Sequence, residues 1–444
     1  MRKLVLLVVL LGLVLSAAST VFADTPAPGG PFSSAFRVMN LDSASVSCEV
    51  DFYNGNGISQ FHYGPDSINP GDSLYLYVPD LSGLADGEYS AIVACNSANV
   101  AAVVNFSDPD SGASHSGIAD ADLAQVFFAP GIYNDYFDFY SNLYVQNASS
   151  SPVDMTVSIY APGSATPIAT QTATNVPANA SRSFDQKGLA GLSSGVAYSA
   201  KIEATGNVAA VANIYGGAGT GVANQLYSYN PVASGSTVAY APVIMNAYYG
   251  YNTSLVIQNM GTGSTDYTVT YGSCQTQTGT IAAGASASLY TPTSGVPANT
   301  LTGAKVESSS EDIVVLVNES TDKNRAASYI GFSGGSTTVS APVVMKRFYK
   351  YNSSITCQNI GASSTMMTIS YSGIAGSTSS PSIAPGGTHL FYQPSESSLA
   401  NNWIGSATIT ASQDIVCVVN QDMNEPPERD QLMDQLYAYE GIGQ

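Results

Sequence analysis

Charged residues are scarce in this sequence, and basic residues are the scarcest of all. Lys and Arg total 13 against 32 Asp and Glu, so 10% of the 444 residues are charged and the formal net charge is −19. A chain with this balance repels phosphate backbones and anionic membrane surfaces, which argues against nucleic-acid binding. Hydrophobic residues make up 44% of the chain, too many for a disordered protein.

Sequence signatures of catalysis are also missing. The chain holds three His and one Trp, and it contains no Gly-x-Ser-x-Gly, no His-Glu-x-x-His and no phosphate-binding loop. His389 aligns with residues other than His in the remaining copies of the repeat described below, so no repeated histidine site exists. We therefore expect a protein that is not an enzyme.

The longest apolar run lies at the start of the chain. Leu4 to Leu15 follows the basic Arg2 and Lys3, and Val21-Phe22-Ala23 fits the small-x-small rule for signal cleavage. We predict a signal peptide over residues 1–23 with Asp24 as the mature N-terminus. A run of 12 residues is too short to span a bilayer comfortably, and no second long run follows. The expected location is secreted, extracellular or at the cell surface, without membrane insertion after cleavage.

Three stretches of the sequence repeat without gaps, each from Ala-Pro to Gln-Asn. They cover residues 129–147, 241–259 and 341–359, and each carries an aromatic cluster followed by alternating apolar residues. Alternation at period two predicts a strand with one buried face. A later apolar strand ends four times in Asn, at Asn105, Asn213, Asn318 and Asn420. The sequence therefore predicts four copies of one unit.

The spacing of the signals predicts an all-β fold. Strand signals recur every 8 to 15 residues between Gly, Pro and Asn turns, and helical periodicity is missing. We predict four tandem Ig-like antiparallel β-sandwich domains, over residues 24–127, 128–239, 240–339 and 340–444. The linkers between them are short and β-like. We expect a stiff, elongated array, a rod of roughly 130 Å if each unit is about 33 Å across.

The combined pattern is an Ala-Pro aromatic segment with Ser-x-Leu-x-Val-Gln-Asn, then Ile-Ala-Pro-Gly, then Val-Val-Asn. It resembles a tandem repeat found in secreted surface proteins of filamentous green non-sulfur (Chloroflexota-type) bacteria. The resemblance covers nearly all of the mature chain. It implies an exported, non-enzymatic, Ig-like array, and it names no ligand.

The first unit departs from the pattern. The position 17 residues before Asn40 is residue 23, the predicted cleavage site, so the mature chain would lack the Ala-Pro aromatic segment here. Unit one is then expected to have an incomplete first strand and an open sheet edge, and open edges are templates for strand addition. One hypothesis is that residues 435–444 of one molecule complete unit one of the next. The alternative is a terminal cap with fewer strands.

Five Cys remain in the predicted mature chain. Cys48 and Cys95 fall in unit one and Cys357 and Cys417 in unit four, so each pair is a disulfide candidate in an exported protein. The alternative is buried free thiols. Cys274 in unit three is left over, as a free thiol or an intermolecular bridge.

One acidic loop is the best candidate for a metal. Asp108 and Asp110 alternate beside Ser-Gly, and carboxylate oxygens suit calcium. The loop lacks the closing Glu of a full calcium loop, so a solvated turn is the alternative.

The aromatic clusters are the most repeated unusual feature. They are candidate binding residues, because exposed rings can hold sugars or a neighbouring subunit, but they could equally pack the joints between units. The residues are Tyr136, Phe137, Phe139, Tyr248, Tyr249, Tyr251, Phe348, Tyr349 and Tyr351. Acidic residues flank the first cluster (Asp135 and Asp138) and basic residues the last (Lys346, Arg347 and Lys350), which suggests oppositely charged patches that meet between molecules.

These features favour a structural or adhesive cell-surface protein, such as the subunit of a filament, sheath or surface layer. Its partners would be itself or other surface proteins, by strand addition or through surfaces rich in Tyr, Ser, Thr and Asn. The alternative is a carbohydrate-binding array that tethers cells to polysaccharide. No cofactor is expected apart from the calcium considered above.

Overall fold

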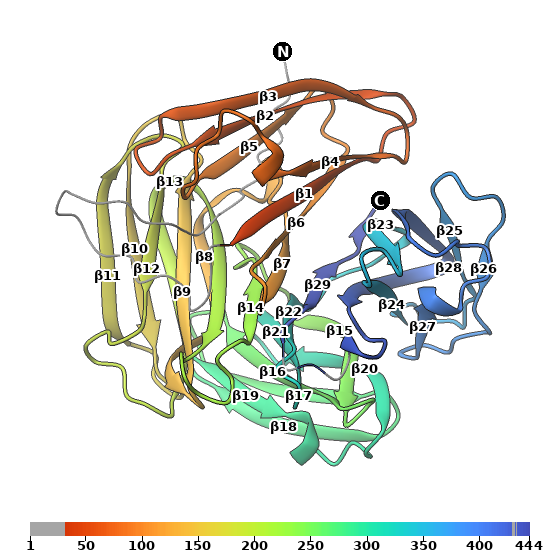
Figure 1. Cartoon of the computed structure of the whole chain (residues 1–444). Coiled ribbons are helices and arrows are strands. Elements are labelled where there is room, and N and C mark those ends of the chain that lie inside the picture. The colour runs from red at the N-terminus through yellow and green to blue at the C-terminus, as the bar shows by residue number, and fades with distance from the viewer. Residues whose placement is uncertain (1–31, 429–430, 432) are drawn as a thin grey trace.

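The computed structural model describes residues 32–444 apart from 429, 430 and 432 (Figure 1). The predicted signal peptide and mature N-terminus lie outside the described residues. In the part described, every regular element is a β-strand or a short 3-10 helix, and the strands pair antiparallel, which confirms the all-β prediction. None of these helices has the length and hydrophobicity that a membrane span requires.

The elements fall into four repeats in chain order. Repeat one contains β1 (Ser33–Asn40), β2 (Val46–Tyr53), β3 (Ser59–Ile68), β4 (Ser73–Tyr77), η1 (Val78–Asp80), β5 (Ser90–Cys95), β6 (Val100–Ser107), β7 (Gly112–Ser116) and η2 (Asp120–Asp122). Repeat two contains β8 (Ala124–Tyr136), β9 (Phe139–Asn147), β10 (Val153–Tyr160), β11 (Pro167–Val176), β12 (Ser181–Asp185), β13 (Ala197–Gly216) and β14 (Leu226–Tyr229).

The second half of the chain follows the same order. Repeat three contains β15 (Val238–Asn246), β16 (Tyr251–Asn259), β17 (Thr265–Tyr271), β18 (Gln275–Ile281), β19 (Ser286–Tyr290), η3 (Thr291–Thr293), β20 (Thr300–Ser308), β21 (Ile313–Thr321) and β22 (Ala326–Ile330). Repeat four contains β23 (Ser336–Lys346), β24 (Asn352–Asn359), β25 (Met367–Tyr371), β26 (Thr378–Ser379), β27 (Thr388–Tyr392), η4 (Gln393–Ser395), β28 (Trp403–Asp422), β29 (Leu436–Glu440) and β30 (Ile442–Gly443).

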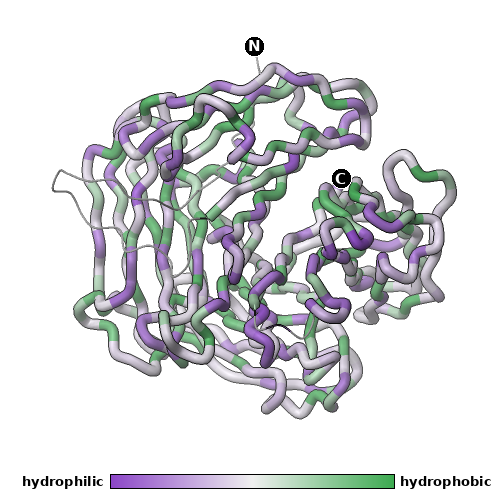
Figure 2. The backbone as a smooth tube through the Cα atoms, viewed as in Figure 1, coloured by the Kyte–Doolittle hydropathy of each residue, from purple (hydrophilic) through white to green (hydrophobic). Residues whose placement is uncertain are grey.

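Repeat three shows the sheet arrangement most simply. One sheet has the order β19-β16-β21-β22 and the other β15-β20-β17-β18. Leu255 and Val315 of the first sheet share one hydrophobic core with Val269 and Val306 of the second. Apolar and polar residues alternate along such strands, as Figure 2 shows, because each sheet has one face on a core. In repeats two and four the long strands β13 and β28 run through both sheets and join them.

Within the described residues, repeat one has no strand at the place that β15 takes in repeat three. Its sheets are β4-β1-β6-β7 and β3-β2-β5, and within the described residues β5 pairs only with β2. The corresponding strand of repeat three, β20, pairs on that side with β15. The residues that precede β1 lie outside the described part of the chain.

A buried asparagine ends one strand in every repeat and holds the following turn. Its side-chain Nδ2 donates to two backbone carbonyls and its Oδ1 accepts the amide two residues later, as at Asn147 with Ser151, Val176 and Ser149. The four residues are Asn40, Asn147, Asn259 and Asn359. These bonds satisfy buried backbone groups at the end of the strand, which explains the Asn that recurs at this place in the sequence.

Both cysteine pairs are disulfide-bonded. Cys48 of β2 is joined to Cys95 of β5, and Cys357 of β24 to Cys417 of β28. Each bond links neighbouring strands within one repeat. Cys274 is a free thiol at an exposed position.

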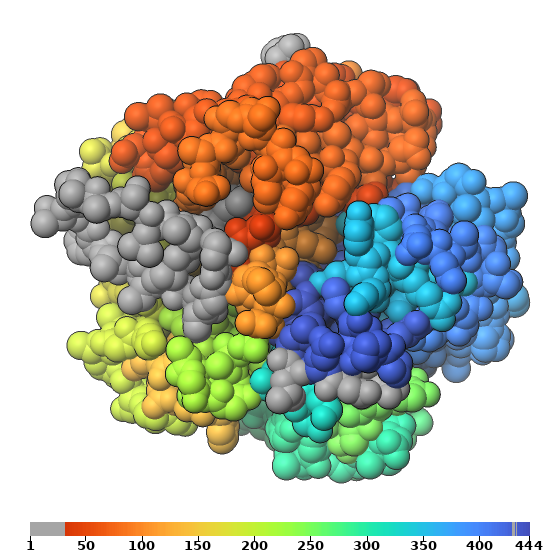
Figure 3. Space-filling model, in the orientation of Figure 1, coloured from red at the N-terminus to blue at the C-terminus, as the bar shows by residue number. Residues whose placement is uncertain are grey.

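The four repeats close into a ring. Their last strands, β7, β14, β22 and β29, gather at the centre, where each contacts the next and β29 returns to β7 (Figure 1). In the space-filling view repeat one, in orange, lies against repeat four, in blue (Figure 3). The predicted rod is therefore wrong, because the linkers that suggested it are the beginnings of β15 and β23 and pack within the ring.

One contact recurs at three of the joints, including the joint that closes the ring. A serine hydroxyl of one repeat donates to the carbonyl of a turn residue in the next: Ser90 to Asn179, Ser199 to Gly284, and Ser406 of repeat four to Gly71 of repeat one, at 2.6–2.8 Å. A contact used in one direction around a closed ring is a heterologous cyclic interface. The repeats are thus related by rotation about the central strands.

The C-terminal segment named in the strand-donation hypothesis is paired within its own molecule. β29 pairs with β28 of its own repeat, and Leu436 and Tyr439 are almost fully buried. Donation of this segment to another molecule stays a hypothesis.

A closed ring should be compact in solution. A compact chain of this length has a radius of gyration of about 22 Å, whereas a rod of about 130 Å would have about 38 Å. We expect small-angle X-ray scattering of monomeric protein to give a value near the lower figure. A value near the higher figure would contradict the closure between repeats four and one.

Candidate functional site

The aromatic clusters form the tips of three hairpins, β8–β9, β15–β16 and β23–β24. At each tip one ring is strongly exposed: Phe137 at 76%, Tyr249 at 86% and Tyr349 at 77%. All three adopt left-handed backbone, with φ of 51°, 50° and 46°. An exposed aromatic residue in this conformation is strained, and such strain is found mainly where function requires it.

The exposed aromatic ring at each hairpin tip packs against the aromatic ring of the residue before it. Tyr136 and Phe137, Tyr248 and Tyr249, and Phe348 and Tyr349 form edge-to-face pairs with ring centroids 4.7–4.8 Å apart. The repeated geometry holds the exposed ring in one orientation at little cost in side-chain entropy.

The third aromatic residue of each cluster anchors the hairpin base. The Tyr251 hydroxyl donates to Asp422 across the joint between repeats three and four, and Tyr351 donates to Gln435 near the centre. Phe139 packs edge-to-face on Tyr227 at 5.6 Å. Burial raises the pKa of Tyr251 and Tyr351, so both hydroxyls stay protonated donors. The sequence clusters thus combine packing residues with exposed ones.

Clefts lie between the tips and the next repeat around the ring. Joint 3–4 holds a cleft of about 510 Å³ between Tyr248 and Tyr249 on one side and Leu390 and Tyr392 on the other. Joint 4–1 holds a smaller cleft of about 250 Å³ between Phe348 and Tyr349 and the strand residues Tyr75 and Tyr77. Because rotation relates the repeats, equivalent hairpins and clefts lie at the same end of the central axis.

Two buried amide oxygens border these clefts without a hydrogen-bond partner. Asn420 lines the cleft of joint 3–4 and Asn105 that of joint 4–1, and they occupy equivalent positions. Their Nδ2 groups donate to Glu319 and Gln421, but in the described residues both Oδ1 atoms lack a donor. A buried acceptor without a partner costs free energy, which a ligand hydroxyl or water could recover.

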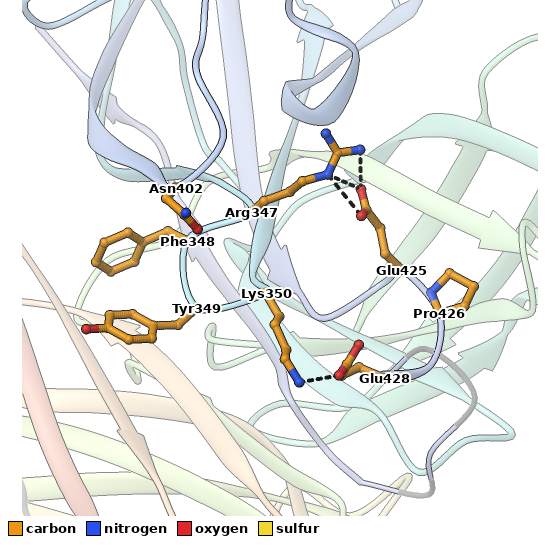
Figure 4. A pocket seen from close by; sticks show the side chains of 8 residues that line it. All are labelled: Arg347, Phe348, Tyr349, Lys350, Asn402, Glu425, Pro426 and Glu428. Atoms are coloured by element: carbon orange, nitrogen blue, oxygen red, sulfur yellow. Dashed lines mark hydrogen bonds and ion pairs between the residues drawn. The ribbon is translucent and has the colours of Figure 1, made fainter.

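The basic cluster of repeat four is largely neutralised within its own repeat. Arg347 forms an ion pair with Glu425, Nη2 to Oε1 at 2.8 Å, and Lys350 pairs with Glu428 (Figure 4). The Lys346 ammonium donates to the Glu396 carbonyl. Figure 4 shows the rings of Phe348 and Tyr349 on the other side of the hairpin from these pairs. The suggested charge contact between molecules therefore loses its basic partner.

The candidate calcium loop uses its carboxylate in a turn. Asp108 Oδ1 accepts hydrogen bonds from the amides of Asp110 and Ser111 and from the Ser111 hydroxyl, at 2.7–3.0 Å. Among residues with described positions, no group of three or more His, Cys, Asp or Glu side chains could hold a metal ion. Calcium at Asp108 and Asp110 stays a prediction.

The facing tyrosines were not singled out from the sequence. Tyr77, Tyr290 and Tyr392 occupy one equivalent position on the aromatic strand of repeats one, three and four, and all are exposed. The alternation in Leu74-Tyr-Leu-Tyr77 signals an outward-facing tyrosine, but nothing in it indicates that a hairpin of the preceding repeat lies opposite.

No protein-family model matches the sequence, and no curated protein does. Among solved structures, Thermotoga maritima 1070 matches with 20% identity over 22% of this chain and 95% of its own, at a TM-score of 0.20. The Anabaena sensory rhodopsin transducer matches with 15% identity over 19% of this chain and 90% of its own, at a TM-score of 0.17. Scores this low support no conclusion on fold or function.

Proposed function

We propose that this chain is an exported, non-enzymatic protein of the cell surface with an adhesive or structural role. In this proposal four Ig-like β-sandwich repeats form a rigid ring that presents aromatic side chains to a partner. The observation that carries it is the set of three strained, exposed rings, Phe137, Tyr249 and Tyr349, at the same end of the ring. Large exposed aromatic residues are the typical anchors of binding surfaces.

Two of the three histidines form hydrogen bonds within the fold. His62 pairs with Asp51 on an exposed strand, and His115 is buried and contacts the Ser116 carbonyl. In the described residues, neither bond places a histidine beside a serine or cysteine nucleophile, as acyl-transfer chemistry requires.

Polysaccharide binding is the second candidate, and the composition of the clefts favours it. Aromatic faces stack on sugar rings, and the polar side chains of Asp322 and Asn424 border the cleft of joint 3–4 beside the tyrosines. Three tips on one rigid ring would also allow several weak contacts to one polymer chain to add up.

The test is binding of the secreted protein to insoluble glycans and to whole cells. Replacing Phe137, Tyr249 and Tyr349 together by Ala should reduce retention at least tenfold, because each aromatic anchor contributes about 1–2 kcal/mol or more. The folded ring should remain, since the three rings are exposed.

Ile168→Ala is the matched control, because Ile168 is an exposed apolar residue of β11 away from the hairpins. It should leave retention unchanged. Equal retention by the triple variant and the wild type would show that the tips are not the binding surface.

A further inference from the structure

The three joints with an aromatic hairpin tip differ at two paired positions on neighbouring strands. Counting three residues back from the strand-end Asn of repeats three, four and one gives Val256 at joint 2–3, Thr356 at joint 3–4 and Arg37 at joint 4–1. Their cross-strand partners are Ser288, Leu390 and Tyr75. Of these three joints, only the one that closes the ring therefore has a cation and a second tyrosine at these positions.

Arg37 lies in this joint without a carboxylate partner among the described residues. Its Nη1 donates to the Ser73 hydroxyl at 3.0 Å, and its guanidinium lies 5.1 Å from the centroid of the Tyr75 ring. In the same part of the chain Nε is buried and has no hydrogen-bond partner. Burial lowers the pKa of Arg37, with the nearby Tyr75 opposing the shift, but an arginine stays charged at any physiological pH.

A charge in this position is unfavourable unless something compensates it. Arg325, the other deeply placed arginine, has Nε 3.0 Å from Asp422 Oδ1. Asp66 and Asp72 border a separate cavity of about 540 Å³ beside Arg37, but neither forms an ion pair with it. Desolvating a guanidinium without an anion is unfavourable, and the cation–π contact with Tyr75 recovers only part of that cost.

We propose that the cleft of joint 4–1 is an anion subsite that binds the carboxylate of an acidic sugar residue through Arg37. This inference rests on the polysaccharide-binding proposal and names the ligand class for one of its clefts. The cleft of about 250 Å³ is bordered by Arg37, Tyr75 and Tyr349, so a sugar ring can stack while its carboxylate meets the guanidinium. Arginine binds carboxylates through two parallel N–H bonds of its planar guanidinium, which makes Arg37 the side chain on this cleft best suited to an anion.

The alternative is that Arg37 is purely structural and covers Tyr75. If Arg37 were purely structural, the affinity of the cleft for a ligand would not depend on the charge of that ligand. At joint 3–4 the equivalent Thr356 lines a cleft with similar aromatic walls, so that joint should accept neutral sugars instead. The two joints of one molecule therefore serve as an internal comparison.

The test is isothermal titration of the full secreted chain with a galacturonate trisaccharide, a galactose trisaccharide and sodium sulfate. Wild type should bind galacturonate at one site, more weakly at high salt. Arg37→Thr, which installs the residue of joint 3–4, should weaken galacturonate binding about tenfold to a hundredfold, whereas galactose should still bind at joint 3–4, which the substitution does not touch. Thermal unfolding of the variant checks that the joint still forms.

A gain-of-function variant keeps the test informative if Arg37→Thr unfolds. Thr356→Arg combined with Leu390→Tyr should raise the number of galacturonate sites from one to two.

Galacturonate binding that survives Arg37→Thr would overturn the anion subsite while leaving the clefts as sugar sites. Sulfate binding as tight as galacturonate would overturn the sugar assignment. Failure to bind either trisaccharide at any joint would instead reject the polysaccharide proposal itself.

Discussion

Replacing Asp434 with alanine should destabilise the ring more than any other single substitution considered for this chain. The Asp434 side chain is fully buried at one end of the central strands. Its carboxylate accepts the amides of Leu226 and Ala326, which begin β14 and β22, at 2.7 and 2.8 Å, and that of Leu436 in β29 at 3.3 Å. The side chain of Asp434 therefore links repeats two, three and four by hydrogen bonds.

The expected loss follows from the groups left behind. Alanine would leave three buried amides without acceptors, at about 1–3 kcal/mol each, against a total stability of about 5–15 kcal/mol for a typical domain. We expect a large fall in the urea midpoint, or failure to fold. The measurement is urea unfolding followed by tyrosine fluorescence at neutral pH.

Asp434→Asn and Asp110→Ala are the controls. Asparagine keeps one acceptor oxygen but turns an NH₂ toward one of the amides, so its loss should be intermediate. Asp110 is the corresponding residue of repeat one, but it is exposed and contacts Asp434 through its carbonyl, which alanine retains. A loss for Asp434→Ala no larger than that for Asp110→Ala would show that the centre does not depend on this carboxylate.

The position of Asp434 shows why local patterns predicted the strands but not the ring. Asn224 and Asn324 occupy the equivalent position in repeats two and three. The repeat pattern therefore does not indicate that Asp434, the residue of repeat four at this position, has a special role. Its role depends on β14, β22 and β29 meeting, and these strands are about 100 residues apart in sequence. Period-two alternation reports only which face of a strand is buried.

The same limit applies to the joints. The local sequence predicts a strand at Ser406 and a turn at Gly71. These two predictions are the same whether the repeats form a ring or a rod. The contact that closes the ring depends on a rotation of about 90° from each repeat to the next, so that four repeats complete a circle, which no single segment encodes. The turn asparagines, by contrast, act within one repeat, which is why their recurrence in the sequence identified strand ends.

The aromatic hairpins lie between these cases. Their recurrence pointed to a binding or packing role, and the structure divides the two roles between adjacent residues. Tyr249 is exposed because its backbone is left-handed, whereas Tyr251 two positions later turns toward Asp422. Left-handed residues at a tight turn interrupt the alternation, so period two could not tell which ring faces solvent.

Stability of the ring should fall as the pH rises through about 8, because of Glu319. This residue of β21 is fully buried, its Oε2 accepts from Asn420 Nδ2 at 2.6 Å, and its Oε1 has no partner in the described residues. Burial raises the pKa of Glu319 to about 8, and the bond from Asn420 opposes the shift. Tyr251, Tyr329 and the Arg325–Asp422 pair are the other ionisable groups nearby.

The sign follows from proton linkage. A glutamate in the unfolded chain has a pKa near 4.3, so between about pH 4.3 and pH 8 the folded state holds a proton that the unfolded state has released. The contribution of Glu319 to stability is complete below that range and is lost as the pH rises through 8, with a slope of up to about 1.4 kcal/mol per pH unit. Burial also raises the pKa of Asp422, to about 6, which adds a loss of the same sign at lower pH.

Glu319→Gln isolates the effect, because glutamine has the shape of the protonated acid and cannot ionise. Urea midpoints measured from pH 5 to pH 9 should decline in the wild type and decline less in the variant, because the raised pKa of the buried Asp434 acts in both proteins. The variant should be the more stable of the two at pH 9. Glu203→Gln on the exposed surface should follow the wild-type curve. Parallel curves for Glu319→Gln and the wild type would mean that Glu319 is already ionised in the folded ring, stabilised by Asn420 and by relaxation of the joint between repeats three and four.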